Sequence, residues 1–223
     1  MASSSNFEEI TNILPVLSKT FGIRNDLSQE ETLRLRHVFE TCAKKEKFAE
    51  FIREIKLMLN LPLSFRIQYE CPRIIRDAPV PLRKFLLKTL RNQTGRAAWI
   101  SIPSNFPLYG DPDLEDWTLQ ININQAFYYE SFESFFYCVL HEMNHVLLKL
   151  VKPEIWENEK ATDLLAMVLG FSKIVKVGMT SSVSGQAYGY LSEKEVRFAH
   201  RKISRLQENN GSLGKAMWKF FRF

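Results

Sequence analysis

Two histidines that lie four residues apart in a long apolar segment constrain this chain more than any other feature. From Ser131 the sequence reads SFESFFYCVLHEMNHVLLKLV, in which apolar residues recur at helical spacing. Ser131 can act as the N-cap and Lys152-Pro153 closes the segment, so we expect a buried helix between them. On this helix the rings of His141 and His145 would project from one face, one turn apart.

The residues between these histidines complete an HExxH pattern, His141-Glu142-Met143-Asn144-His145, which is typical of zinc peptidases. Two imidazole rings can bind one Zn²⁺ ion, while Glu142 acts as the general base towards a zinc-bound water. The alternative is a pair of core histidines bonded to backbone carbonyl groups, which would leave Glu142 unexplained in the same buried patch. The pattern therefore predicts a zinc site.

A catalytic zinc ion has three protein ligands and one open position, so a third ligand is needed. After a short turn, a second helical pattern runs from Ile155 to Gly170, where we expect the helix to end. This helix carries Glu159, the candidate third ligand, and Asp163 one turn further along the same face. Asp163 could accept the N–H group of a ligating histidine and so fix its tautomer.

The segment Asn158-Glu159-Lys160-Ala161-Thr162-Asp163 looks like the NExx(S/T)D motif of gluzincin metallopeptidases. In that family the glutamate binds zinc and the aspartate supports a histidine ligand. The resemblance covers about thirty of the 223 residues, and it implies a zincin-like core with zinc bound by His141, His145 and Glu159. The compact chain is also similar to the intracellular ImmA/IrrE-type peptidases, which cut regulatory proteins. An HEMxH sequence occurs in SprT-like proteases too, whose third ligand is a histidine.

The sequence before the motif indicates an α+β fold that is mostly helical. Residues 6–60 read as helical, with a capping box at Ser28–Glu31 and a break near 44–47. We expect residues 1–60 to form a helical extension that packs on a zincin-like domain over residues 61–223. The extension could cover the catalytic core or bind a partner.

A small sheet is expected between that extension and the motif helix. The segments 64–69, 97–102 and 117–123 read as strands, and a helix is expected at 79–92. Within the last strand, 117–121 is our candidate for the edge of the sheet. An extended peptide could bind there by adding itself as a further strand.

Hydrolysis of a peptide on a metal ion also needs a donor for the oxyanion. The chain beyond Phe171, above all Gly178–Tyr190, reads as a loop rich in small residues that could close over a site. The candidate donors are Tyr188, Tyr190 and His200, all of which follow the ligands in the sequence. We favour the two tyrosines, because His200 belongs to a basic helical segment.

Composition and charge narrow the class of protein. The cysteines Cys42, Cys71 and Cys138 are too few and too scattered for a disulfide scaffold, no apolar run is long enough to span a bilayer, and the first residues do not form a secretion signal. A cytoplasmic location is therefore the expectation. The net charge of +5 permits weak attraction to nucleic acid but does not indicate a nucleic-acid-binding protein.

Two functions from different classes fit these observations. The first is a zinc-dependent metalloendopeptidase that hydrolyses peptide bonds of one or a few intracellular proteins. Its choice of substrate would be set by its own specificity or by a regulatory protein partner. The second is a non-catalytic zinc-binding protein that acts through interaction or regulation. A DNA-associated protease of the SprT-like kind is a further alternative, which rests only on the basic charge.

Overall fold

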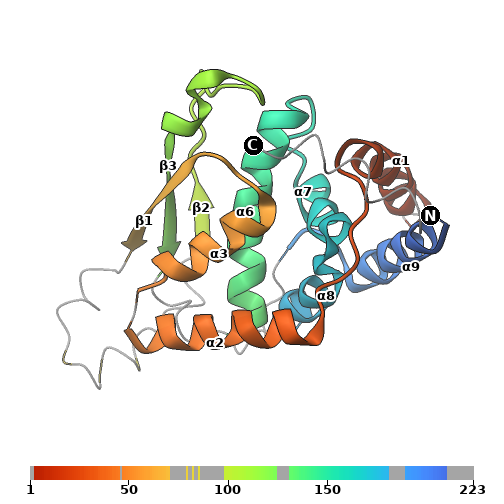
Figure 1. Cartoon of the computed structure of the whole chain (residues 1–223). Helices are drawn as coiled ribbons and strands as arrows, with labels where there is room; N and C mark the ends of the chain where they lie inside the picture. The colour runs from red at the N-terminus through yellow and green to blue at the C-terminus, as the bar shows by residue number, and fades with distance from the viewer. Residues whose placement is uncertain are drawn as a thin grey trace.

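The computed structural model describes residues 3–45, 47–70, 98–124, 131–180 and 189–209, together with the single positions 79, 82 and 85. In this part of the chain the fold is mostly helical with one small sheet, which confirms the expected α+β class (Figure 1). The helices in chain order are α1 (Ser3–Phe21), α2 (Gln29–Lys45), α3 (Ala49–Leu59), η2 (Pro112–Asp116), α6 (Phe132–Val151), α7 (Glu159–Ala166), η4 (Met167–Phe171), α8 (Ser172–Thr180) and α9 (Glu193–Asn209).

The sheet contains β1 (Ser64–Glu70), β2 (Ala98–Ile100) and β3 (Thr118–Asn124) in the order β1-β3-β2. β3 pairs with β1 in parallel and with β2 antiparallel. The strands fall where they were expected, but the assignment of 117–121 to the edge is wrong, because β3 is paired on both sides. The second half of β3 is buried residue after residue, as is typical of a central strand. In the described sheet β2 lies at one edge, and it packs against α6.

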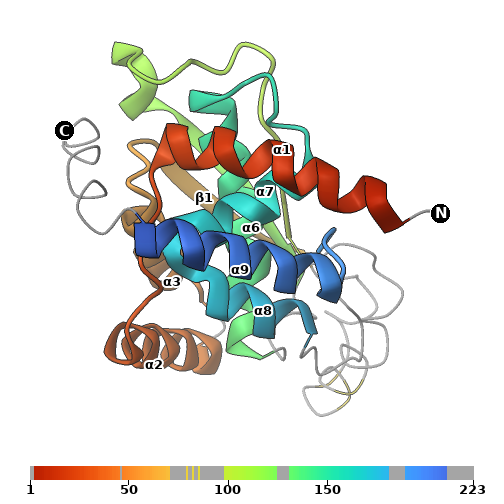
Figure 2. The same ribbon diagram turned by 90° about the vertical axis from the view of Figure 1, so that its right-hand side faces the viewer.

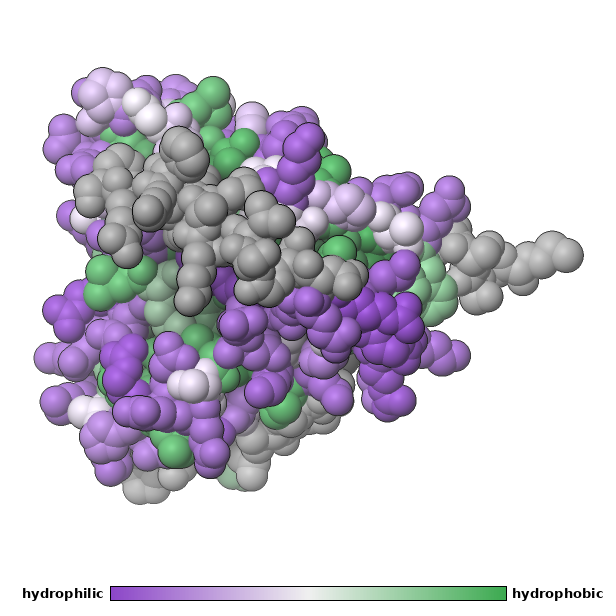
Figure 3. Space-filling model, turned by 45° about the vertical axis from the view of Figure 1, so that its right-hand side comes forward, coloured by the Kyte–Doolittle hydropathy of each residue, from purple (hydrophilic) through white to green (hydrophobic). Residues whose placement is uncertain are grey.

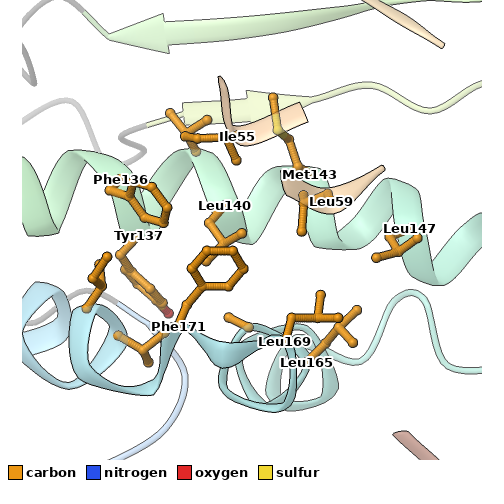
Figure 4. Packing of buried hydrophobic residues seen from close by; sticks show 14 of the residues in the cluster. Ile55, Leu59, Phe136, Tyr137, Leu140, Met143, Leu147, Leu165, Leu169 and Phe171 are labelled. Atoms are coloured by element: carbon orange, nitrogen blue, oxygen red, sulfur yellow. The ribbon is translucent and has the colours of Figure 1, made fainter. Parts of the chain in front are cut away.

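The central helix of the molecule is α6, which lies between the sheet and the pair formed by α7 and α8 (Figure 1). Its N-cap is Ser131 as expected, since the Ser131 hydroxyl accepts from the Ser134 N–H group at 3.2 Å. Leu140 and Met143 are completely buried, and the helix packs against α3 on one side and against Leu165 and Phe171 on the other (Figure 4).

The N-terminal helices share one hydrophobic cluster with α6. In α2 and α3, Phe39 and Phe51 lie against the α6 ring of Phe135, and the Phe48 ring stacks on Phe135 with centroids 4.4 Å apart. α1 packs on α7 and, with α9, crosses the outer side of α7 and α8 (Figure 2). The boundary at residue 60 stays a prediction, although these contacts show how closely residues 3–59 are joined to the rest.

The capping box expected in the N-terminal region is present. The Ser28 N–H group donates to the Glu31 carboxylate at 2.8 Å, and the Glu31 N–H group donates to the Ser28 hydroxyl at 3.1 Å. The predicted break near residues 44–47 is also present, because α2 ends at Lys45 and α3 begins at Ala49. The helix expected at 79–92 lies almost entirely outside the described residues.

The second helical pattern begins later than expected and ends where it was expected to end. α7 begins at Glu159 rather than Ile155, because Asn158 caps it. At Gly170 (φ +88°, ψ 23°) the backbone leaves the right-handed helical region, so a helix ends there as expected, and α8 begins directly afterwards at Ser172. A Cβ atom at Gly170 would overlap the Asn25 carbonyl group, so glycine is required there by both the dihedral angle and the space. Residues 172–180, where a loop was expected, form the helix α8 instead.

Apolar side chains are gathered in the interior. On the face shown in Figure 3, the described surface is mainly hydrophilic, and hydrophobic residues form only small separate groups. α6 is the most apolar of the long helices, yet neither it nor any other helix in the described ranges combines enough length and hydrophobicity to cross a membrane.

Candidate metal centre

The two helices that follow the sheet bring three metal-binding side chains together. α6 supplies His141 and His145 on one face, and α7 supplies Glu159 from its first turn. Asn158 fixes the start of α7, because its side-chain oxygen accepts from the Ala161 N–H group at 2.9 Å. The Glu159 Oε2 atom lies 3.0 Å from His141 Nε2 and 3.1 Å from His145 Nε2, and the two Nε2 atoms are 3.2 Å apart.

This triangle of donor atoms has the size that a tetrahedral metal ion requires. Bonds of about 2.0–2.2 Å from zinc to nitrogen and oxygen place neighbouring ligand atoms about 3.3 Å apart. The three observed distances of 3.0, 3.1 and 3.2 Å are close to that value. The largely buried group formed by His141, His145 and Glu159 could therefore hold a metal ion.

The second nitrogen of each histidine ring has an acceptor of its own. His145 Nδ1 lies 2.7 Å from the Trp156 carbonyl oxygen, and His141 Nδ1 lies 2.8 Å from Asp163 Oδ1. Because a carbonyl oxygen and a carboxylate can only accept, each Nδ1 atom carries the proton. Each Nε2 atom in the neutral ring then offers a lone pair, and both lone pairs belong to the donor triangle. This is the tautomer that metal-ligating histidines need.

In the absence of a metal ion, His141, His145 and Glu159 differ in how strongly they hold a proton. Burial alone would lower the pKa of His141, but hydrogen bonds to Asp163 and Glu159 outweigh burial and raise that pKa to about 10. Burial lowers the pKa of His145, and the neighbouring His141 lowers it further. The hydrogen bond from His141 lowers the pKa of Glu159. A proton therefore resides on His141 at neutral pH and would have to leave before a metal ion binds.

Glu142 lies on the side of α6 that faces the sheet. Its carboxylate accepts from the Ile100 N–H group of β2 at 3.1 Å. Glu142 is half-buried and does not belong to the donor triangle. The carboxylate is thus held beside the cluster, at the edge strand of the described sheet, by a backbone donor.

Of the three residues predicted as oxyanion donors, the structure brings one to the cluster. The Tyr190 ring stacks on the His141 ring, with centroids 5.6 Å apart, and the Tyr190 side chain is exposed. Tyr188 lies outside the described residues. His200 lies half-buried in α9, and within the described ranges no hydrogen bond, ion pair or ring contact joins it to the three ligands. The structure therefore gives the prediction of His200 as a catalytic residue no support.

Tyr137 is a contributor to the site that sequence reasoning missed. Its hydroxyl donates to Asp163 Oδ1, the same oxygen that accepts from His141. Burial raises the pKa of Tyr137 well above its ordinary value, and the charge of Asp163 raises it further, so the hydroxyl keeps its proton. A signal was available, because Tyr137 lies one turn before His141 in an apolar helix, where a hydroxyl group needs a partner.

Trp156 was also missed, because it acts through its backbone. Its carbonyl group orients His145, and no pattern of side-chain types reveals a backbone acceptor of this kind. The Lys149 ammonium group lies 4.6 Å from the centroid of the Trp156 ring, a cation–π contact that helps to fix the turn between α6 and α7.

The first turn of α7 is held in place by Lys160, which follows Glu159. The Lys160 ammonium group lies 3.0 Å from a Glu9 carboxylate oxygen and 2.9 Å from a Glu195 oxygen. The two partners come from α1 and α9, so helices from both ends of the chain hold the residue next to Glu159 in place.

Comparison with known proteins returns no relative. No model of a protein family matches the chain, and neither curated proteins nor solved structures show a significant similarity to it. The chemistry of the site is therefore the basis for any conclusion about function.

Proposed function

We propose that this chain is a zinc-dependent metalloendopeptidase of the gluzincin type, which hydrolyses peptide bonds of one or a few protein substrates. The observation that carries the proposal is the donor triangle of His141, His145 and Glu159, in which the atoms lie 3.0–3.2 Å apart. The acceptors on both Nδ1 atoms support it, because they select the tautomer in which each Nε2 atom can bind a metal ion.

The number of ligands and their exposure favour a catalytic zinc site over a structural one. Structural zinc sites are closed by four protein ligands, whereas catalytic sites keep one position open. Among the described residues the cluster has three members. The side chains of His141 and His145 are 9% and 12% exposed, but that of Glu159 is 39% exposed, so solvent can reach the cluster from its side.

The residues around the cluster suit the hydrolysis of a peptide. When bound, zinc would polarise a water molecule and the scissile carbonyl group. Glu142 would take a proton from the attacking water and deliver it to the leaving nitrogen. Tyr190, which stacks on His141, is the described residue best placed to stabilise the oxyanion.

A place for an extended substrate is suggested by β2. This strand lies at the edge of the described sheet, and the Ile100 N–H group contacts Glu142. A peptide that added itself along the β2 edge would pass beside the general base. We therefore propose β2, in place of the segment 117–121, as the strand that binds the substrate.

The proposal is tested by Glu142→Gln, which removes the base and keeps the shape of the side chain. Zinc-loaded parent and variant are incubated with a cell lysate, and new peptide termini are quantified by mass spectrometry. We expect the variant to bind zinc like the parent and to cleave about 10²- to 10⁴-fold more slowly. Glu157→Gln is the matched control, because Glu157 is exposed near the cluster but is not part of it, and it should cleave at the parent rate.

The outcomes separate the two classes of function. Cleavage by the parent that a chelator abolishes and zinc restores would support the peptidase. Stoichiometric zinc without any new peptide terminus would favour the non-catalytic zinc-binding alternative. Equal cleavage by the parent and Glu142→Gln would overturn the role assigned to Glu142.

A further inference from the structure

One buried carboxylate joins the metal ligand to a distant part of the chain. Asp163 is completely buried, and it accepts three hydrogen bonds. Its Oδ1 atom accepts from the Tyr137 hydroxyl and from His141 Nδ1, and its Oδ2 atom accepts from the Tyr190 N–H group at 2.8 Å. The donors come from α6 and from the segment Gly189–Tyr190, which begins nine residues after the end of α8 at Thr180.

Gly189 is fitted closely to this arrangement. It has φ +100°, and a Cβ atom built on it would overlap the Tyr137 hydroxyl and approach the end of Met179 at 2.6 Å. Any other residue would therefore be strained and would push the Tyr137 hydroxyl away from Asp163. The Tyr137 ring reaches from α6 towards the neighbouring helices, so its hydroxyl lies on the side where α7 packs (Figure 4).

The contacts of Tyr137 allow its hydroxyl to be removed without leaving a cavity in the core. A phenylalanine would fill the same space, because only the hydroxyl of Tyr137 contacts the carboxylate. Without this donor, the carboxylate would keep two of its three hydrogen bonds, from His141 to Oδ1 and from the Tyr190 N–H group to Oδ2, and would be held less firmly. The orientation of the His141 ring would then be less well fixed, although the core would stay filled.

We propose that Tyr137 is a positioning residue for the metal ligand His141, acting through Asp163, and that Asp163 couples metal binding to the placement of Gly189–Tyr190. The inference rests on the metal site put forward above and deepens it. A metal ion that fixes the His141 ring fixes Asp163, and Asp163 in turn holds the Tyr190 N–H group. Coupling of this kind is reciprocal, so displacement of Gly189–Tyr190 weakens metal binding. Loss of the Tyr137 hydroxyl weakens it separately, because Asp163 is then held less firmly.

Zinc affinity, measured by competition with a chromophoric chelator, tests the first half of the proposal without any substrate. Tyr137→Phe should bind zinc about 10- to 100-fold more weakly than the parent, as is usual when a residue that supports a metal ligand is lost. Tyr69→Phe is the matched control: its hydroxyl accepts from the Phe48 N–H group at 2.7 Å, on β1 at the far edge of the sheet, so its zinc affinity should equal that of the parent.

Hydrogen exchange of the unaltered protein tests the second half and needs no variant. Zinc should slow the exchange of the Tyr190 amide. The Asn60 amide, which donates to the Leu57 carbonyl group at 3.1 Å at the end of α3, should be unaffected. Gly189→Ala should weaken zinc binding as Tyr137→Phe does.

The results distinguish the inference from the proposed function. If the parent binds no zinc, both are overturned. If the parent binds zinc with a Tyr190 exchange rate that zinc does not change, the coupling is wrong while the metal site stands. If Tyr137→Phe folds and binds zinc as tightly as the parent, Tyr137 is a packing residue only.

Discussion

Because His141 is protonated in the metal-free protein, we expect its zinc affinity to depend on pH by a calculable amount. Hydrogen bonds to Asp163 and Glu159 overcome the effect of burial and raise the pKa of His141 to about 10. The metal-free protein therefore carries this proton at pH 7 and at pH 8, and zinc must displace it. The pKa values of His145 and Glu159 are lowered, so neither residue contributes a further proton in this range.

The expected magnitude follows from the release of one proton. When each bound zinc ion displaces one proton from a group that is fully protonated, the dissociation constant falls about tenfold for each pH unit. Zinc should thus bind about ten times more tightly at pH 8 than at pH 7. Isothermal titration calorimetry in two buffers with different ionisation enthalpies measures both the affinity and the number of protons released.

A variant of Asp163, the buried carboxylate bonded to His141, distinguishes proton release from His141 from a general effect of pH on zinc binding. Asp163→Asn replaces the charged acceptor that contributes most to raising the pKa of His141 with a neutral one, so zinc binding should depend less steeply on pH. Equal zinc affinity at pH 7 and pH 8 in the parent, with no proton released, would refute the assignment of His141 as a protonated group that becomes a ligand.

Three further predictions concern stability. Asn158→Ala removes the N-cap before Glu159, so it should lower the free energy of unfolding by about 1 kcal/mol and also weaken zinc binding. Ser28→Ala, at the N-cap of α2, should lower the free energy of unfolding by a similar amount and leave zinc binding unchanged. Urea unfolding and zinc titration compare the two variants. Gly170→Ala should cost about 3 kcal/mol in urea unfolding, because strain at φ +88° adds to overlap with a neighbouring backbone. Gly110→Ala, with φ +92° in open space, should cost only about 1–2 kcal/mol, and equal losses would contradict the close approach. Finally, the raised pKa of His141 means that the folded metal-free protein keeps a proton that the unfolded chain loses above the ordinary histidine pKa of 6.5. The free energy of unfolding should therefore fall by about 1.4 kcal/mol for each pH unit between about pH 7 and about pH 9. A constant free energy of unfolding over this range would contradict the raised pKa of His141.

Local patterns were sufficient to predict α6 and the placement of His141 and His145 on one of its faces. The apolar spacing, the cap at Ser131 and the four-residue separation of His141 and His145 are all properties of one continuous segment. The capping box at Ser28–Glu31 is local in the same sense, and it is present. Glu159 and Asp163 lie on the next helix in the sequence, so only one turn had to be crossed to place them near the histidines.

Most of the incorrect predictions concern features that depend on contacts between residues distant in the sequence. The apolar letters from Ile155 onward fit a helix, but the cap at Asn158 starts it later. The alternation at 117–121 indicates a strand and does not reveal which strands lie beside it. Gly170 ends a helix as predicted, but the chain beyond it forms α8 instead of the expected loop, and the Ser172 N–H group at the start of α8 donates to the Asp26 carboxylate at 2.9 Å, a contact distant in the sequence.

The central claim is that His141, His145 and Glu159 bind one divalent cation. Anomalous X-ray diffraction at the zinc edge, from crystals of the protein loaded with one equivalent of zinc, tests it most directly. We predict a single strong peak about 2.0–2.2 Å from both Nε2 atoms and the Glu159 carboxylate. A zinc peak at His37, His200 or elsewhere, with the three side chains left without metal, would contradict the claim.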